Sequence, residues 1–504
     1  MTMSDYTLNH PDLGSIIGLA RDDAVVQFRG IPFASVPGRF RQSIRREGPL
    51  PSQPFSARQP GPECPQSVLP FPTYWTAPPP SGYPTLEKPI QDEFNCLNLS
   101  ITAPRKVLES GHNVPVLFFI HGEAVGNYGL HDQRQALERV SRFIGGFGGA
   151  SDRITIHGTS AGGVSCHYHV NFPDRKFKNA ILSSGTCVGI APKPMPWHQE
   201  RFDRMVSQIP SLQADDSLLD SLVDLPLSQL LPASPPIIYS PLVDGEWVPE
   251  AGLKPTLEKL SKAGEPLPNL MIGATEYERD LTLILLSDLS KPLPPPPRAE
   301  AEILPIAQDL LAGSVMIPHL NSSDSPFCVP EVAHAYNLSR EKSSLDSFED
   351  LAGLMADAAF RTPPIYSAAV IQKHQIAHGH ASHVLLYEIQ ATNPYKNWSL
   401  GYKRANHGIN DLFLFNPAED QVPAEHLESW VSTVGQIRAA WLDFCYGKMP
   451  WTPFQWSGDI ESLGGIYVFP DGGKSRLCKT LDEVDGKATA TRWRALLKTS
   501  FEKI

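Results

Sequence analysis

The chain lacks several features that mark whole classes of protein. Its seven cysteines include no Cys-x-x-Cys pair, which excludes a zinc ribbon and a thioredoxin-type redox motif. No stretch approaches the roughly 20 consecutive apolar residues of a transmembrane helix. Charged residues are scarce, at 19%, and leave a net charge of -11. An acidic chain of this kind does not present the basic surface that nucleic acids and anionic membranes require.

Residues 1–18 also lack the basic start and the apolar run of a secretory signal peptide. We therefore expect a cytoplasmic protein, or a secreted one only if the sequence lacks its true N-terminus. In the cytoplasm the cysteines should stay reduced, because glutathione keeps thiols open. The odd number of cysteines leaves at least one free thiol in either compartment.

Apolar residues and proline, by contrast, are plentiful. Hydrophobic residues make up 41% of the 504 residues, which is enough to bury a large core and too many for a disordered chain. Prolines number 49, close to a tenth of the chain against a usual share of about 5%. This excess predicts proline-rich surface loops, which we place at residues 47–90 and 286–300. The length allows several domains, but one large α/β domain with insertions fits equally well.

Short apolar runs that indicate buried strands alternate with helix-like segments. These runs cover residues 114–120, 153–157, 180–183, 270–273 and 384–388. Between the first two, residues 132–147 carry apolar side chains near a 3.6-residue period and end in glycines, as an amphipathic helix does. The alternation predicts an α/β fold with a mainly parallel central sheet and helices on both of its faces.

The strongest motif follows the strand predicted at 153–157 and precedes a helix predicted to run to His169. Its sequence is Gly158-Thr159-Ser160-Ala161-Gly162, a G-x-S-x-G motif. A sharp strand-to-helix turn of this kind strains the serine backbone and lifts its hydroxyl above the sheet edge. The start of the helix supplies backbone N–H groups where an oxyanion forms. The motif predicts a nucleophilic Ser160, which needs a histidine base and an acid that orients this base.

With several further segments, this motif resembles the type-B carboxylesterases, the cholinesterase-like branch of the α/β-hydrolases. The resemblance extends from about Gly14 to Trp451. The stretches that carry it are residues 30–34 (GIPFA), 64–66 (CPQ), 93–100 (EFNCLNLS), 126–134 (GNYGLHDQR), 153–163 (RITIHGTSAGG), 241–245 (PLVDG) and 405–408 (ANHG). The resemblance implies an α/β-hydrolase fold in one catalytic domain over residues 1–504. It also implies hydrolysis of carboxylic esters through an acyl-enzyme, with no cofactor and no metal ion.

The resemblance also assigns a catalytic triad. Ser160 matches the nucleophile of the family and His407 its general base. Glu278, within residues 272–280 (IGATEYERD), falls at the position of the acid, with Glu276 as its rival. In this assignment His407 takes the Ser160 proton as the hydroxyl attacks the ester carbonyl, and Glu278 holds the imidazole in the right tautomer.

Three further residues have counterparts in the family. Ser184 resembles a serine that packs near the acid, although a strand-end hydroxyl bonded to backbone explains it equally well. Cys64 and Cys96 lie in the two segments that carry the first disulfide of the family. The resemblance therefore implies that they are close enough to bridge. Two buried, unpaired thiols are the alternative.

The residue before the nucleophile departs from the family pattern. Thr159 stands where the family usually has glutamate. A carboxylate at this position modulates the imidazolium of the base. Its loss is tolerable, because the triad does not contain it.

The loop after the first buried strand departs more seriously. After His121-Gly122 the family continues with further glycines and several dozen residues that include a core strand, whereas here Glu123 follows and the GNYGL stretch comes at once. The oxyanion donors are then Ala161 and, nominally, Gly122 and Glu123, and each lost donor costs about 10²–10³ in rate. We expect a sheet that lacks one core strand. It should have an unpaired edge or a gap between 114–120 and 153–157, unless these two strands close up.

These observations predict a hydrolase of small-molecule carboxylic esters. A catalytically weak or silent relative that binds partners through the same fold is one alternative, but the complete triad speaks for an enzyme. An acyltransferase that passes the acyl group to an alcohol is the other, and its sequence features are those of the hydrolase.

Overall fold

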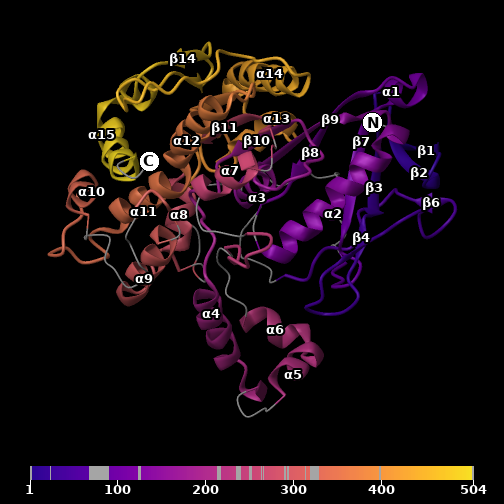
Figure 1. Ribbon diagram of the computed structural model, residues 1–504, viewed down its shortest axis with the longest axis horizontal. Helices are drawn as coiled ribbons and strands as arrows, with labels where there is room; N and C mark the ends of the chain where they lie inside the picture. The colour runs from indigo at the N-terminus through magenta and orange to yellow at the C-terminus, as the bar shows by residue number, and fades with distance from the viewer. Residues whose placement is uncertain are drawn as a thin grey trace.

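The protein is described from a computed structural model, which covers residues 3–22, 24–66, 90–122, 126–212, 217–233, 240–248, 253–262, 264, 266–288, 291, 295–312, 314–317, 329–396 and 399–501. A seven-stranded sheet lies at its centre (Figure 1), in the strand order β14-β13-β12-β11-β10-β9-β8. These strands are β8 (Val114–Ile120), β9 (Gly149–Thr159), β10 (Asn179–Ser183), β11 (Asn269–Thr275), β12 (Val384–Ile389), β13 (Ile466–Phe469) and β14 (Arg476–Cys478). Only β13 and β14 pair in the antiparallel sense. The predicted mainly parallel sheet is confirmed.

Successive residues of the central strands enter two different apolar cores. One core contains Ile181, Met271 and Leu385, and the other contains Leu182, Ile272 and Leu386. Each of these side chains is at most 1% exposed. Side chains alternate between the two faces of a strand, so a strand that is covered on both faces needs an unbroken apolar run. This requirement explains why the strands stand out in the sequence.

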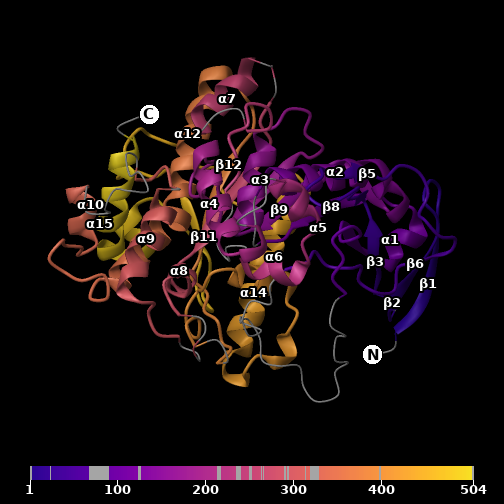
Figure 2. The same cartoon turned by 90° about the horizontal axis from the view of Figure 1, so that it is seen from below.

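Helices cover the two faces of the central sheet. Figure 2 shows α14 (Ala424–Cys445) on one side of the strands, and α3 (Ala161–Val170) and α12 (Pro363–His378) on the other. The predicted helix 132–147 is α2 (Asn127–Phe143), which begins and ends earlier than its sequence pattern indicated. Further helices are α1 (Arg105–Ser110), α4 (Met195–Ser207), α5 (Leu218–Asp224), α6 (Leu227–Ala233), α7 (Leu253–Lys262), α8 (Arg279–Leu285), α9 (Glu300–Leu311), α10 (Pro330–Ala335), α11 (Phe348–Ala356), α13 (Ile409–Phe415) and α15 (Leu481–Phe501). In the part of the chain that is described, no helix is long and apolar enough to cross a membrane.

A second, smaller sheet is formed by the N-terminal part of the chain and lies to one side of the central sheet (Figure 1). Its order is β1-β2-β3-β7, with β6 paired to β2. The strands are β1 (Met3–His10), β2 (Gly14–Arg21), β3 (Val25–Pro32), β6 (Phe55–Ser56) and β7 (Asn98–Pro104), and β4 (Ala34–Ser35) forms a separate pair with β5 (Ile44–Arg45).

The two proline-rich segments form loops wherever the structure describes them. In the first, residues 47–66 contain only the two-residue strand β6, and residues 67–89 lie outside the described part. In the second, α9 begins at Glu300, and residues 289, 290 and 292–294 lie outside the described part.

Strand β8 is the outer strand of the central sheet, and the gap that we considered beside it is absent. Residues 116–120 pair in parallel with residues 154–158 of β9, after a register shift between Val114 and Val116. Among the described residues no other strand pairs with β8. The side chain of Phe119 is 39% exposed and contacts the ring of Phe415. The two strands are therefore directly paired, and the free edge lies on the other side of β8.

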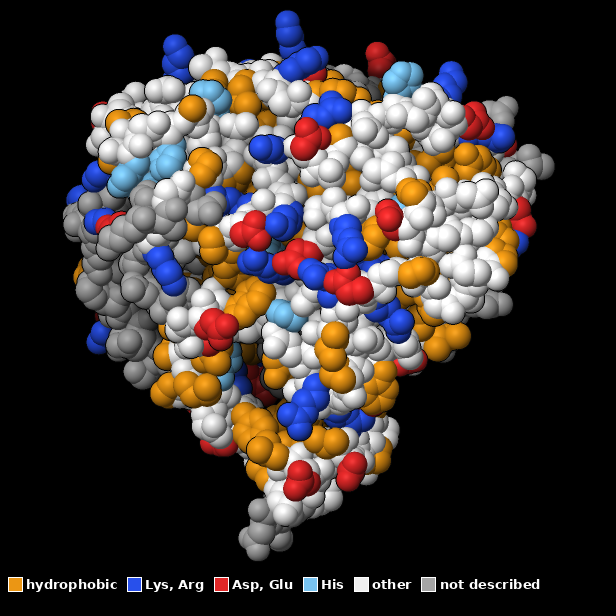
Figure 3. All heavy atoms as spheres, turned by 45° about the vertical axis from the view of Figure 1, so that its right-hand side comes forward, with side chains coloured by type: hydrophobic (Ala, Val, Ile, Leu, Met, Phe, Trp, Pro, Cys, Tyr) orange, Lys and Arg blue, Asp and Glu red, His pale blue; other side chains and the backbone are white. Residues whose placement is uncertain are grey.

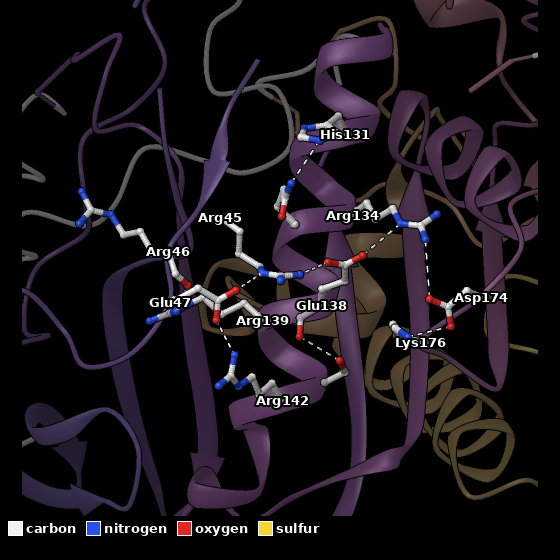
Figure 4. Close-up of polar contacts among 12 residues, drawn as sticks. Arg45, Arg46, Glu47, His131, Arg134, Glu138, Arg139, Arg142, Asp174 and Lys176 are labelled. Carbon is white, nitrogen blue, oxygen red and sulfur yellow. Dashed lines mark hydrogen bonds and ion pairs between the residues drawn. The ribbon is translucent and has the colours of Figure 1, made fainter. Parts of the chain in front are cut away.

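A chain of ion pairs holds α2 against its neighbours (Figure 4). Arg45 of β5 binds Glu138 of α2, whose carboxylate also accepts a hydrogen bond from Arg134 at 3.2 Å. Arg134 in turn lies 3.9 Å from Asp174, which binds Lys176. Acidic and basic side chains also alternate across the face shown in Figure 3. Because these groups are partly exposed, each pair contributes only about 0–1 kcal/mol, and their main effect is to orient the helix.

Cys64 and Cys96 are both free thiols in this structure. Their side chains are nevertheless in contact. A hydrogen bond with Cys96 lowers the pKa of the Cys64 thiol to about 7, and the same contact, together with burial, raises the pKa of Cys96. The two cysteines are thus close together, as the resemblance implies, without being linked.

We expect a mild disulfide-forming oxidant to link Cys64 to Cys96 in the native protein. The reason is that a thiol with a pKa of about 7 is largely thiolate at mildly alkaline pH, and the thiolate is the reactive form. Peptide mapping by mass spectrometry without reduction would detect the link. A Cys64→Ser variant should not form it, whereas a Cys478→Ser variant should. If the wild-type thiols stay separate under the oxidant, their geometry does not permit a bridge.

Candidate active site

The carboxyl ends of the parallel strands meet at one edge of the central sheet, and the predicted site residues follow these strand ends. Gly122 comes two residues after β8, Ser160 directly after β9, Ser184 directly after β10 and Glu278 three residues after β11. His407 lies farther along the chain, in the segment between β12 and α13. Ligands of open α/β sheets bind at this edge, because the loops that leave the strands converge there.

The backbone at Ser160 has the strained conformation that the motif predicts. Its φ is 61° and its ψ is -128°, values that cost a non-glycine residue about 1–3 kcal/mol. The Ser160 N–H donates to the carbonyl of Ser183 at 2.9 Å, and the Ser160 carbonyl accepts from the N–H of Val164 at 3.0 Å. The turn thereby joins β9 to α3, with the N–H of Ala161 in the first turn of the helix.

Glycines allow the backbone segments around this turn to touch. A Cβ atom on Gly158 would lie 2.3 Å from the backbone of Gly162, and one on Gly162 would lie 2.1 Å from the carbonyl oxygen of Ile120. A Cβ atom on Gly185 would lie 2.0 Å from the Ser160 carbonyl oxygen. Real Cβ contacts are not this short, so a side chain at any of the three positions would push the strand ends apart.

We expect Gly162→Ala to lower the free energy of unfolding by about 1–3 kcal/mol, as overpacking of a close-packed site does. The variant should also lose activity, because the backbone of Ile120 must move away from the nucleophile turn. Gly435→Ala is the matched control, since a Cβ atom there meets no other atom within 4 Å. This control should be neutral or stabilising by about 0.4–1 kcal/mol. Denaturant unfolding measures both, and equal stability of the two variants would contradict the close approach at Gly162.

Glu278 is completely buried and its carboxylate is bound on both oxygens. Oε1 accepts hydrogen bonds from the backbone N–H and the hydroxyl of Thr275, both at 2.9 Å. Oε2 accepts a short hydrogen bond from Nδ1 of His407. Glu278 is the last residue before α8, in the short segment that joins β11 to this helix. The acid is therefore fixed by the strand end on one side and holds the histidine on the other.

The loop that carries His407 is tied to the loop that carries Glu278. The backbone N–H of His407 donates to Asp280 at 3.1 Å, and the N–H of Tyr277 donates to the carbonyl of Ala405 at 2.9 Å. The ring of Phe360 packs against the imidazole with 5.1 Å between ring centroids. Backbone bonds and ring packing together hold the imidazole in one orientation.

The electrostatics of the pair favour an ionised acid and a basic imidazole. Burial alone would raise the pKa of Glu278, but the charge and hydrogen bond of His407 more than offset it, so the pKa of Glu278 lies below its ordinary value. Burial likewise would lower the pKa of His407, yet the charge and hydrogen bond of Glu278, with smaller contributions from Asp280 and Asp411, raise it. Each partner thus stabilises the charged form of the other.

Two further features of the site are the second nitrogen of the imidazole and the backbone N–H groups that could donate to an oxyanion. Nε2 of His407 is buried and has no hydrogen-bond partner among the described residues, so it is available to accept a proton. A Cβ atom on Gly122 would lie 3.5 Å from Cβ of Ser160, which puts this residue against the nucleophile. Ala161 begins α3 beside it. The third nominal donor, Glu123, lies outside the described residues.

The structure places Glu278 beside His407. Glu276, its rival, lies elsewhere. The backbone N–H of Glu276 donates to Ile389 at 2.8 Å, and burial together with the charge of Asp485 raises the pKa of Glu276 while Arg361 lowers it. Its carboxylate thus faces a different group of charges. Among the described residues no cluster of three or more His, Cys, Asp or Glu side chains is arranged to hold a metal ion.

Ser184 lies next to the acid, as the resemblance implies. Its backbone has a positive φ of 48°, and its N–H donates to the carbonyl of Gly273 at 2.8 Å. The side chain is buried, and its proximity contributes to the lowered pKa of Glu278. The hydroxyl oxygen makes no well-oriented hydrogen bond in the described part of the chain.

A polar contact that the sequence did not predict joins Thr159 to α13. The hydroxyl of Thr159 donates to Asp411 at 2.8 Å and accepts from the side-chain amide of Asn410 at 2.8 Å. Burial raises the pKa of Asp411 to about 7, while the Thr159 hydroxyl and the charge of His407 lower it. The absence of glutamate at position 159 was the one signal that another carboxylate occupies this place.

We expect Asp411→Asn to shift the acid limb of the kcat/KM pH profile to lower pH. The charge of Asp411 helps to raise the pKa of His407, so its removal lets this pKa fall. Because the neutral imidazole is the active base, activity then persists to lower pH. Asp443→Asn, at an exposed ion pair with Lys448 on α14, is the control and should leave the profile unchanged. An unmoved acid limb in Asp411→Asn would show that this charge does not act on His407.

The strand order, the strained turn at Ser160 and the Glu278–His407 pair after later strands are those of an α/β-hydrolase fold. The chain belongs to the carboxylesterase family. Its sequence matches the family profile, described as "Carboxylesterase family", over residues 10–125 and 122–456. The two matched parts meet at residues 122–125, where the chain departs from the family pattern.

Individual relatives and solved structures agree with this assignment. The chain is 24% identical to Lipase 3 of Yarrowia lipolytica, over 97% of this chain and 96% of the lipase. It is 27% identical to the pyrethroid hydrolase Ces2a of Mus musculus, over 77% of this chain and 73% of that protein. The juvenile hormone esterase of Manduca sexta has the same fold, with a TM-score of 0.71 at 19% identity over 99% of this chain and 100% of the esterase. A PNB esterase gives a TM-score of 0.69 at 19% identity, over 97% and 99% of the two chains.

Proposed function

We propose that this carboxylesterase-family protein hydrolyses carboxylic esters through an acyl-enzyme on Ser160, with His407 as general base and Glu278 as the acid. The observation that carries the proposal is the buried hydrogen bond between Glu278 and Nδ1 of His407. It leaves Nε2 as the free nitrogen of the imidazole, at the same sheet edge as the strained serine turn.

The proposed reaction has two halves. Nε2 of His407 takes the hydroxyl proton of Ser160 as Oγ attacks the ester carbonyl, and Glu278 stabilises the imidazolium that forms. The backbone N–H groups of Ala161 and Gly122 stabilise the tetrahedral oxyanion. The imidazolium then protonates the leaving alcohol, and the acyl group stays on Ser160. Water attacks the acyl-enzyme in the second half, with His407 again as base, and releases the carboxylic acid.

The names of the relatives support an ester substrate of small to moderate size. They include lipases, a pyrethroid hydrolase and an acylcarnitine hydrolase, and pyrethroids, acylglycerols and acylcarnitines are all carboxylic esters. A catalytically silent relative is not favoured. Such a protein would be free to lose the triad, whereas Ser160, Glu278 and His407 are all present in this chain. An acyltransferase would use the same triad and differ only in the acceptor. If the N–H groups of Gly122 and Glu123 are displaced from Ser160, we expect turnover reduced by about 10²-fold or more, since each lost donor costs about this much.

We expect a fluorophosphonate probe to label Ser160 in the wild-type protein and not in Ser160→Ala. His407→Ala should lose most of the labelling, because the hydroxyl is a weak nucleophile without its base. Hydrolysis of p-nitrophenyl esters should fall by about 10⁴-fold or more in Ser160→Ala and His407→Ala. Ser207→Ala, on the exposed side of α4, is the matched control.

The same assay separates the alternatives. Acid release without an acceptor identifies a hydrolase, and ester formation that depends on an added alcohol identifies an acyltransferase. A folded wild-type protein that neither binds the probe nor hydrolyses any ester would be the silent relative, and the proposal would then be wrong.

A further inference from the structure

A cavity of about 170 Å³ lies between α4, α9 and the loop that follows β10. None of Ser160, Glu278 and His407 lines it. Much of its wall is apolar and is formed by Ile190, Met205, Leu285, Ile306 and Leu310. In Figure 1, α4 extends from the body of the molecule toward α5 and α6, and the residues of α4 that line the cavity run from Trp197 to Met205. A cavity of about 150 Å³ already accommodates benzene, so this one suits a small organic ligand.

Lys193 brings a positive charge into the cavity without a carboxylate within ion-pair distance among the described residues. The residue is only 8% exposed, and its ammonium group donates to the carbonyl of Ala312 at 2.7 Å. Among the described residues it forms no ion pair. Burial lowers the pKa of Lys193 to about 8, while the charge of Asp309 raises it and that of Arg201 lowers it. The ammonium thus stays largely protonated at neutral pH, and it also contacts the face of the Trp197 ring, 5.8 Å from the ring centroid.

Trp197 and Arg201 add further hydrogen-bond donors near Lys193, and Arg201 binds the nearby carboxylate of Asp309. The guanidinium of Arg201 stacks on the ring of Trp197, 3.2 Å from its centroid, and binds Asp309. The indole N–H of Trp197 is buried and has no acceptor in the described part of the chain. The acid of the cavity is therefore already engaged by Arg201, and the unsatisfied groups are all donors.

A buried charge without a counter-ion destabilises a folded protein unless a partner binds it. The partner that this cavity requires is an acceptor with a negative charge, and the apolar wall requires a hydrocarbon body attached to it. We propose that the cavity binds a small carboxylate with an apolar body, whose head lies between Lys193 and the Trp197–Arg201 stack. The acids released from carboxylic esters belong to this chemical class, but the proposal does not depend on the reaction at Ser160.

Isothermal titration calorimetry with three probes tests the proposal. Hexanoate has both the charge and the apolar body and should bind. Its neutral counterpart 1-hexanol and its short counterpart acetate should each bind at least about tenfold more weakly, because a hydrogen bond to a charged group and the apolar contact are each worth roughly this much. Inorganic phosphate should bind no better than acetate. Equal binding of hexanoate and 1-hexanol would overturn the proposal.

Variants locate the bound probe. Lys193→Met removes the charge and keeps an apolar side chain of similar length, and it should weaken hexanoate by about tenfold or more. Lys448→Met, an exposed cation at the end of α14, is the matched control and should bind like the wild type. Ser160→Ala should also bind like the wild type. Loss of binding in Ser160→Ala would place the probe in the catalytic site and overturn the proposal, whatever the outcome of the esterase assays.

The pH dependence of binding gives a readout that does not rely on a variant. Arg201, Arg204, Asp309 and His198 are the charged and titratable groups near Lys193 or in the lining of its cavity. Burial lowers the pKa of His198, so His198 is already neutral in the mildly alkaline range, and hexanoate remains ionised there. Binding should therefore weaken as the pH rises through about 8, where Lys193 loses its proton. Affinity that does not change across this range would show that the ammonium does not hold the carboxylate.

Discussion

The close approach of backbone segments around Ser160 is the constraint on which the rest of the site depends. The carbonyl oxygen of Ile120, at the end of β8, lies where a Cβ atom on Gly162 would stand, and the carbonyl oxygen of Ser160 lies where a Cβ atom on Gly185, after β10, would stand. This packing makes three parallel strands end at the same level. It also over-determines a serine conformation that is unfavourable by itself, which is the usual condition for such strain to persist. Gly122 and Ser184 reach the site as a consequence of this packing, since each follows one of these strands.

The second element of the site depends on burial as much as on contact. The Glu278–His407 pair lies in an interior where an unpaired carboxylate would be costly, and the pair satisfies that carboxylate with Thr275 on one oxygen and the imidazole on the other. Hydrogen bonds between the two loops fix the imidazole from its backbone side as well. The imidazole is therefore held in one orientation without a substrate, and if it is the proposed base, this lowers the reorganisation that catalysis has to supply.

The two departures from the family have different physical outcomes. At position 159 the hydroxyl of threonine binds the buried carboxyl group of Asp411, so an acidic group still lies close to the imidazole although it comes from another element. At the oxyanion loop the strands β8 and β9 pair directly, and the free edge of the sheet is β8. An edge strand with an exposed phenylalanine is a place where another strand could pair, and the sheet does not cover it within the described residues.

Local pattern was sufficient for the parts of this protein that depend on neighbours in sequence. The buried strands were recognisable because both of their faces are covered, and the nucleophile turn because a strand, a strained serine and a helix must follow one another directly. The resemblance supplied the identities of Glu278 and His407. The tertiary structure alone decided the strand order, the free edge at β8, the partner of Thr159 and the cavity around Lys193. The reason is that these features arise from contacts between distant residues: Glu278 and His407 are 129 positions apart, and Thr159 and Asp411 are 252 positions apart, so no local pattern in the sequence records that they meet.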